Sequence, residues 1–73
     1  MIIEYGTPVR FLARLGAIER GKVGTATRFV GTIEIGQLGL YQNPFDIDGE
    51  PWHIIQFGAW DIPVDETDFE VVG

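Results

Sequence analysis

The side chains best suited to binding a partner are carboxylates, and they are concentrated in one part of the chain. Residues 44–73 contain no Lys or Arg but hold eight acids, namely Asp46, Asp48, Glu50, Asp61, Asp65, Glu66, Asp68 and Glu70. Residues 1–43 hold five cations and three acids, so the two parts carry net charges of +2 and −8 within a total of −6. Fixed carboxylates attract a basic surface over a long range, and salt weakens this attraction.

Three of these acids alternate around an Asp-Gly pair. Asp46, Asp48 and Glu50 flank Gly49 and have three readings: a solvated turn, an anionic patch for a basic partner, or a Ca²⁺ site. The calcium reading is incomplete, because the further ligands and flanking helices of an EF-hand are missing. In the anionic-patch reading, these three acids form part of a surface that binds a partner.

A second acidic group and two tryptophans extend this hypothesis. Asp65, Glu66 and Asp68 could cap a 3₁₀ turn or enlarge the acidic surface. Trp52 and Trp60 could pack in the core or anchor an interface, where exposed tryptophans are typical. We therefore predict a partner-binding surface that contains Asp46, Asp48, Glu50, Trp52, Trp60, Asp61, Asp65, Glu66 and Asp68.

The residue inventory argues against catalysis. The chain has no Cys, which excludes disulfides, thiolate metal sites and a Cys nucleophile. It has one His, His53, which excludes a His-rich metal site and, without a partner nucleophile or second ligand, is expected to be structural. We predict no catalytic residue, no metal, no cofactor and no enzymatic activity.

Size and composition favour one small domain spanning residues 1–73. A chain of 73 residues buries a limited core, so 45% apolar residues must supply the packing and oligomerisation would add to it. No apolar run reaches about 18 residues, and the start of the chain lacks signal-peptide features, so we expect a cytoplasmic protein. An isoelectric point near 4.4 argues against direct binding to nucleic acid.

Frequent glycine and proline predict short strands. Ten Gly and four Pro interrupt the chain too often for long helices. Alternating apolar residues predict strands over 9–14 and 22–30, with a loop or one helical turn over 15–21. Residues 1–5 are expected to form a strand or an arm, and residues 31–44 a ribbon or a long, partly ordered loop.

The second half of the chain carries clearer turn signals. Asp48-Gly49 between apolar residues predicts a β-hairpin, with the returning strand starting at Trp52. Pro63 predicts that its strand lies at a sheet edge or is irregular. The remaining expected elements are a turn at Gly58-Ala59, a strand over Trp60–Val64, a 3₁₀ turn over Asp65–Asp68 and a last strand over Phe69–Val72.

The order "GKVGTATRFVG", "WHIIQFG", "WDIPV" and "FEVV" resembles the SH3-like small β-barrels of bacteria, the KOW-type and translation-protein-SH3-like group. The residues that match are Gly21, Val23, Gly24 and Thr25, then Ile55, Phe57 and Gly58, and finally Phe69–Val72. The resemblance implies an all-β fold, a five- or six-stranded SH3-like barrel with an extended insertion near residues 31–51.

The relatives implied by this resemblance differ in function. The "ALYDY" motif of proline-binding SH3 domains is absent, and the acidic loops lack the basic residues that KOW-type domains use on ribosomal RNA. A plasmid-type dihydrofolate reductase uses this barrel as a tetramer, but its Gln and Tyr are missing from Trp60–Val64. Acidic SH3-like antirepressors resemble this chain in charge and in the expected fold. Their carboxylates occupy the DNA-reading surface of a repressor.

We therefore expect a non-enzymatic interaction module that docks its acidic C-terminal half on a basic protein surface. The narrower form of this hypothesis is a bacterial or phage DNA mimic, an inhibitor or antirepressor whose carboxylates imitate phosphates. The alternative is a structural or assembly subunit that forms homo-oligomers, such as a homodimer, through barrel edge strands. A tetrameric reductase is the third reading.

Overall fold

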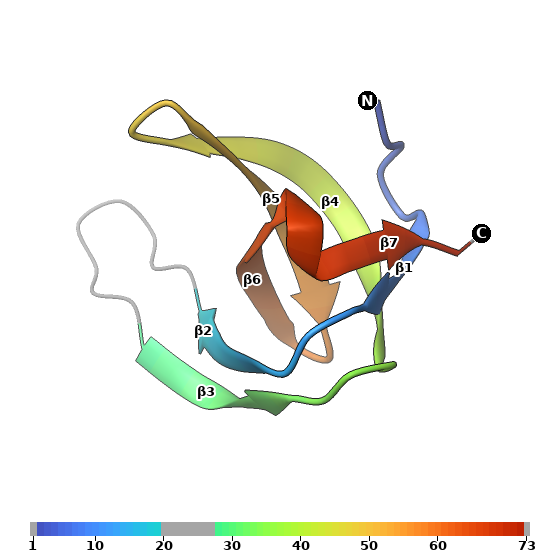
Figure 1. Cartoon of the computed structure of the whole chain (residues 1–73), viewed down its shortest axis with the longest axis vertical. Helices are drawn as coiled ribbons and strands as arrows, with labels where there is room; N and C mark the ends of the chain where they lie inside the picture. Colours follow the sequence, from blue (N-terminus) through green and yellow to red (C-terminus); the bar gives the residue numbers. More distant parts are fainter. Residues whose placement is uncertain (1, 20–27, 73) are drawn as a thin grey trace.

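The structure is a computed structural model that describes residues 2–19 and 28–72. Over these residues the chain is all-β, with two sheets and one short 3₁₀ helix, η1 (Figure 1). The elements are β1 (Pro8–Phe11), β2 (Leu15–Glu19), β3 (Arg28–Ile33), β4 (Leu38–Ile47), β5 (Glu50–Phe57), β6 (Trp60–Asp65), η1 (Glu66–Asp68) and β7 (Phe69–Val71).

A five-stranded antiparallel sheet dominates the fold, and a two-stranded sheet faces it. The strand order of the larger sheet is β6-β5-β4-β1-β7, and the smaller sheet pairs β2 with β3. Figure 1 shows β4 curving around the molecule, so that the chain after it turns back toward the smaller sheet. Strand β2 lies beside β6, but no hydrogen-bonded ladder joins these two strands. The two sheets therefore do not close into a continuous ring.

Two turns predicted from the sequence are confirmed. Asp48 and Gly49 connect β4 to β5 with φ angles of 49° and 83°. Positive φ at both positions is what a type I′ turn requires, and this turn matches the twist of the paired strands. Gly58, with φ of 61°, begins the second turn between β5 and β6. The predicted edge position of Pro63 is also confirmed, because β6 is the outer strand of the larger sheet.

The first part of the chain differs from the sequence prediction. Leu15–Glu19 is strand β2, so the loop or helical turn expected over 15–21 was wrong for residues 15–19, and residues 20 and 21 lie outside the described residues. The cause is pairing with β3, a partner that local sequence preferences do not reveal. The strand expected over 9–14 is shorter and runs from Pro8 to Phe11.

The extended insertion expected near residues 31–51 was also wrong. This stretch contains the end of β3 and all of β4, which is the central strand of the larger sheet. Strand β5 begins at Glu50 rather than Trp52. The strand expected over 22–30 lies mostly outside the described residues, as do the matching residues of the "GKVGT" segment, and its last three positions begin β3.

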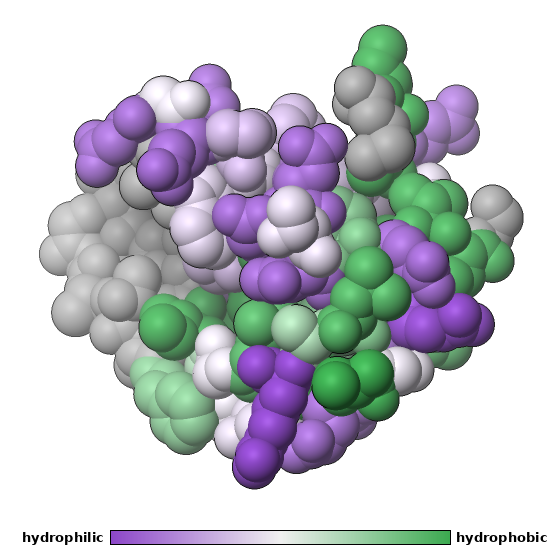
Figure 2. All heavy atoms as spheres, viewed as in Figure 1, coloured by the Kyte–Doolittle hydropathy of each residue, from purple (hydrophilic) through white to green (hydrophobic). Residues whose placement is uncertain are grey.

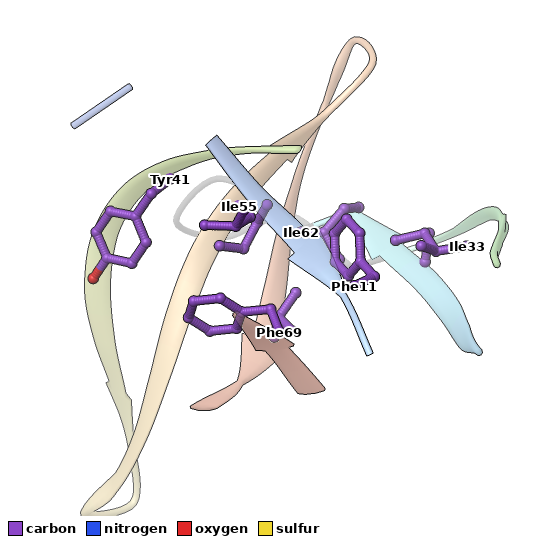
Figure 3. Packing of buried hydrophobic residues seen from close by; sticks show 9 residues of the cluster. Phe11, Ile33, Tyr41, Ile55, Ile62 and Phe69 are labelled. Carbon is purple, nitrogen blue, oxygen red and sulfur yellow. The ribbon is translucent and has the colours of Figure 1, made fainter. Parts of the chain in front are cut away.

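The hydrophobic core fills the space between the sheets (Figure 3). Phe11 of β1 meets Phe57 of β5 edge to face, with 5.8 Å between ring centroids. This geometry is favourable for aromatic pairs. The buried cluster comprises Val9, Phe11, Ala17, Ile33, Tyr41, Ile55, Ile62, Val64 and Phe69. It draws on β1, β4, β5, β6 and β7 of the larger sheet and on β2 and β3 of the smaller one.

Gly39 lets strand β4 approach β5 closely at the centre of this core. A Cβ atom at this position would lie 2.7 Å from Cγ2 of Ile55 and 2.9 Å from the carbonyl oxygen of Gln56. Both distances are too short for carbon, so any side chain must displace the neighbouring strand.

We predict that Gly39→Ala lowers the free energy of unfolding by about 1–3 kcal/mol, because overpacking forces side chains and backbone to shift. Urea denaturation measures the change. Thr32→Ala, at an exposed position of β3, serves as the control and should stay within about 0.5 kcal/mol of wild type. Equal stability of Gly39→Ala and wild type would contradict the close approach.

Candidate protein-binding groove

An apolar groove of about 320 Å³ lies where β2 and β6 run side by side without pairing. Leu15 and Ile18 of β2 line one wall. Trp52 of β5 and Pro63 of β6 line the other, together with neighbouring residues of β6. The groove is therefore bounded by side chains from both sheets, at the place where the ring of strands is interrupted.

Pro63 helps to keep this seam open. Proline has no amide hydrogen, so it cannot donate to a strand laid along the free edge of β6. Edge strands commonly carry such a residue, since it discourages unwanted strand pairing. A ligand in the groove would accordingly be held mainly through side chains.

Two carboxylates border the groove at η1. Asp65 caps this helix: its Oδ1 atom accepts hydrogen bonds from the backbone nitrogen and from Oγ1 of Thr67, each at 2.9 Å. Asp68 is half-buried and also lines the groove. The capping role predicted for this acidic segment is thus confirmed for Asp65.

The cap favours the ionised form of Asp65. The backbone hydrogen bond from Thr67, followed by the one from its hydroxyl, lowers the pKa of Asp65 below its ordinary value of 3.8. Partial burial opposes this effect and the nearby His53 adds to it. A carboxylate stabilised in this way stays negative throughout the neutral range.

The acidic hairpin tip adjoins the groove through strand pairing. Trp52 is the cross-strand partner of Asp65, and Glu50 lies two residues further along the same strand, next to the turn. Asp46, Asp48 and Glu50 are exposed at this tip. Figure 2 shows hydrophilic residues gathered there, at the upper left of the view.

The structure brings together most of the predicted partner-binding residues and separates two of them. Six acids and one tryptophan follow the tip, the groove and η1: Asp46, Asp48, Glu50, Trp52, Asp65, Glu66 and Asp68. Asp61 lies further along β6, where its carboxylate accepts a hydrogen bond from Gln42. Trp60 is half-buried and packs against the core. These two residues therefore do not belong to the groove.

The sequence did not identify the wall that β2 contributes. Leu15 and Ile18 were expected in a loop or helical turn, so their role beside Trp52 could not be anticipated. The apolar character of both residues was the available signal, but the partner strand decides which surface they line.

A buried polar pair supports the strands behind η1. The hydroxyl of Tyr41 and Nδ1 of His53 are 2.8 Å apart, and both rings pack near Phe69. Burial raises the pKa of Tyr41 above 10.0, and the negative charge of Glu66 raises it further. Nε2 of His53 has no hydrogen-bond partner among the described residues. Because both side chains are buried, the pair lies in the core.

The calcium reading of the hairpin tip finds no support in the geometry. Within residues 2–19 and 28–72, no three His, Asp or Glu side chains are placed to hold one metal ion.

The same residues include no helix with the length and apolar character that crossing a membrane requires.

Comparison with known proteins gives no relative for this chain. No protein-family model matches the sequence, and no curated protein or solved structure shows significant similarity to it. The groove and its surroundings are therefore interpreted from their own chemistry.

We predict that Thr67→Val raises the pKa of Asp65 toward 3.8, because one of its two hydrogen-bond donors is removed. Carbon-detected NMR of the Asp65 carboxyl group measures this pKa. Thr32→Val, at an exposed position of β3, is the control and should leave it unchanged. An unaltered pKa in Thr67→Val would contradict the role of the hydroxyl.

The same cap makes stability sensitive to acid. The folded-state pKa of Asp65 is lower than the unfolded-state value, so its contribution is complete above pH 3.8 and is lost as pH falls through the folded-state pKa. We expect Asp65→Asn to lose less stability than wild type over this acidic range. Thermal unfolding in a pH series measures the difference, and parallel curves would contradict the prediction.

We predict that Tyr41→Phe lowers the free energy of unfolding by about 1–3 kcal/mol, because it leaves Nδ1 of His53 buried without its partner. Tyr5→Phe removes the same hydroxyl from an exposed ring and should have little effect. Chemical denaturation compares the two variants. A Tyr41→Phe protein as stable as Tyr5→Phe would show that the hydrogen bond contributes nothing.

Proposed function

We propose that the chain is a non-enzymatic protein-interaction module that takes a basic, partly apolar segment of a partner protein into the groove between β2 and β6. The observation that carries this proposal is the combination in one groove of Trp52, apolar walls and the carboxylates Asp65 and Asp68. Lys and Arg side chains match such a surface, because an aliphatic stem can lie on apolar groups while the charged head reaches an acid.

The charges of the described residues support a cationic ligand. Arg10 forms an ion pair with Glu70, and Arg14 forms one with Glu34, both at 3.2 Å. Neither arginine therefore neutralises the two groove carboxylates. An incoming guanidinium or ammonium would gain charge-assisted hydrogen bonds there and a cation–π contact with Trp52.

The hairpin tip would act at longer range. Asp46, Asp48 and Glu50 are exposed and contribute net negative charge beside the groove. Such charges raise the rate of encounter with a basic surface more than they raise affinity. Nucleic-acid-binding proteins are one class of basic partner, since their Lys and Arg residues otherwise hold phosphates, and the module would then act as a DNA mimic.

We also propose that the two sheets form an open SH3-like barrel. The curvature of the larger sheet, the position of β2 beside β6 and the 3₁₀ turn before β7 support this assignment. The seam between β2 and β6 is then the place where the barrel remains unpaired, and the groove occupies that seam.

The test is an NMR titration with a synthetic peptide of about eight residues, long enough to span the groove, that alternates Arg or Lys with Val or Leu. A second peptide replaces each cation with Glu. We expect the basic peptide to shift amide signals of β2, β6 and η1, to bind less tightly at high salt, and the acidic peptide to leave the spectrum unchanged.

Matched variants distinguish the groove from general charge. Asp65→Asn with Asp68→Asn removes two groove charges, and asparagine can retain the helix cap. We expect the peptide dissociation constant to rise at least about tenfold, corresponding to about 1.4 kcal/mol. Asp61→Asn changes a carboxylate outside the groove and should have little effect.

A further variant in this experiment tests the hairpin tip. Asp46→Asn, Asp48→Asn and Glu50→Gln together should slow association and reduce the salt dependence while the same groove signals still shift. If Asp61→Asn weakens binding as much as the groove variant, or if the basic peptide shifts no groove signal, the proposal is wrong.

A further inference from the structure

The outer face of strands β1, β4 and β7 is a second surface, separate from the groove. Side chains of a strand alternate between the two sides of the sheet. Val9, Phe11 and Tyr41 are buried in the core, so the residues next to them along their strands point outward. We define the outer β1–β4–β7 face by Pro8, Arg10, Leu38, Leu40, Glu70 and Val72.

Strand register places these residues in two adjacent rows. Leu40 lies opposite Pro8, and the backbone nitrogen of Val72 donates to the carbonyl oxygen of Pro8 at 3.1 Å, which gives an apolar row. Leu38 and Glu70 lie on either side of Arg10 in the second row. Apolar residues also cluster beside the chain ends in Figure 2.

The two leucines on this face are unusually exposed to solvent. Leu38 is 59% exposed and Leu40 is 43% exposed, although both belong to the central strand of the larger sheet. Exposed apolar residues that adjoin one another on a regular sheet are typical of interaction surfaces. Polar residues follow on the neighbouring strands, where Gln56 is opposite Leu40 and Asp61 is opposite Gln56. An apolar centre with a polar rim is the usual anatomy of a protein interface.

The charge of this face determines which kind of partner it can approach without repulsion. Its two charged residues, Arg10 and Glu70, form an ion pair with 3.2 Å between Nη1 and Oε1, so the six residues together are neutral. The whole chain carries −6, and the described residues of the hairpin tip, the groove and η1 include six acids. Two copies can therefore approach through this face without bringing excess like charge together, whereas a strongly basic partner gains more from the acidic end.

We propose that the outer β1–β4–β7 face binds a second copy of the chain in a symmetric dimer. In a two-fold interface each residue of the face serves on both sides, so Leu38 and Leu40 pack on the same face of the other copy. Each Arg10–Glu70 pair can also exchange partners across the axis, because a two-fold contact is self-complementary. A chain of this size, with a limited core, gains apolar burial from the association. The groove remains open in both copies.

Sedimentation equilibrium from about 1 µM to about 1 mM tests the dimer, a range that covers weak and moderate association. We expect a concentration-dependent dimer of the wild-type chain. Leu38→Lys and Leu40→Lys should each raise its dissociation constant at least about tenfold, because each puts a charge without a partner into an apolar contact on both sides of the interface. Ile35→Lys is the matched control: it adds the same charge at an exposed position in the turn between β3 and β4.

A charge swap tests the self-complementary ion pairs. Arg10→Glu alone leaves acids facing acids and should dissociate the dimer, whereas Arg10→Glu combined with Glu70→Arg restores neutrality and should restore association. Near-UV circular dichroism confirms that each variant is folded. Dissociation by the lysine variants and recovery by the swap would support the proposal.

Three outcomes would overturn it. They are a wild-type chain that stays monomeric over the whole range, a dimer that Leu38→Lys and Leu40→Lys leave intact, or a dimer that Ile35→Lys weakens equally. Peptide binding by the groove requires none of these results, so the two proposals can fail separately.

Discussion

The register of the β4–β5 hairpin is the constraint on which the candidate site depends. Positive φ at Asp48 and Gly49 sets a two-residue turn and places Ile47 opposite Glu50. Because side chains alternate along a strand, a slip of one residue would turn His53 outward. With the observed register, His53 meets Tyr41 in the core, and Trp52 lies opposite Asp65 at the groove.

The groove exists because two adjacent strands do not pair. Strand β2 belongs to the smaller sheet and β6 is the edge of the larger one, so their meeting leaves a seam that side chains line. Pro63 makes the edge of β6 a poor template for another strand. A seam of this kind offers apolar surface and carboxylates at the same place.

The acidic excess has different consequences at different places. At the hairpin tip and η1 the carboxylates accumulate beside the groove, and the helix cap lowers the pKa of Asp65. On the outer β1–β4–β7 face, Glu70 is balanced by Arg10. Net charge by itself would describe the molecule as uniformly acidic. Among the described residues, the acids instead gather at the hairpin tip, the groove and η1, whereas the outer β1–β4–β7 face is neutral.

Local chemistry made several features predictable from the sequence. The Asp48-Gly49 turn, the edge position of Pro63 and the cap at Asp65 depend on backbone preferences and short-range hydrogen bonds, and all three are present. The sequence also singled out Asp65 and Asp68, the two acids that line the groove, because charge can be read directly from composition. The sequence by itself thus determined the all-β class, the turns and the sign of the charge.

Tertiary structure decided which of these residues meet. Leu15–Glu19 becomes a strand because β3 supplies its hydrogen-bond partners, and no local pattern in that segment indicates this. The same long-range pairing makes β4 the central strand, places Leu15 and Ile18 beside Trp52, and leaves Asp61 and Trp60 outside the groove. Strand pairing joins segments that are distant along the chain, so its outcome depends on the packing of the whole core and not on the preferences of any one segment.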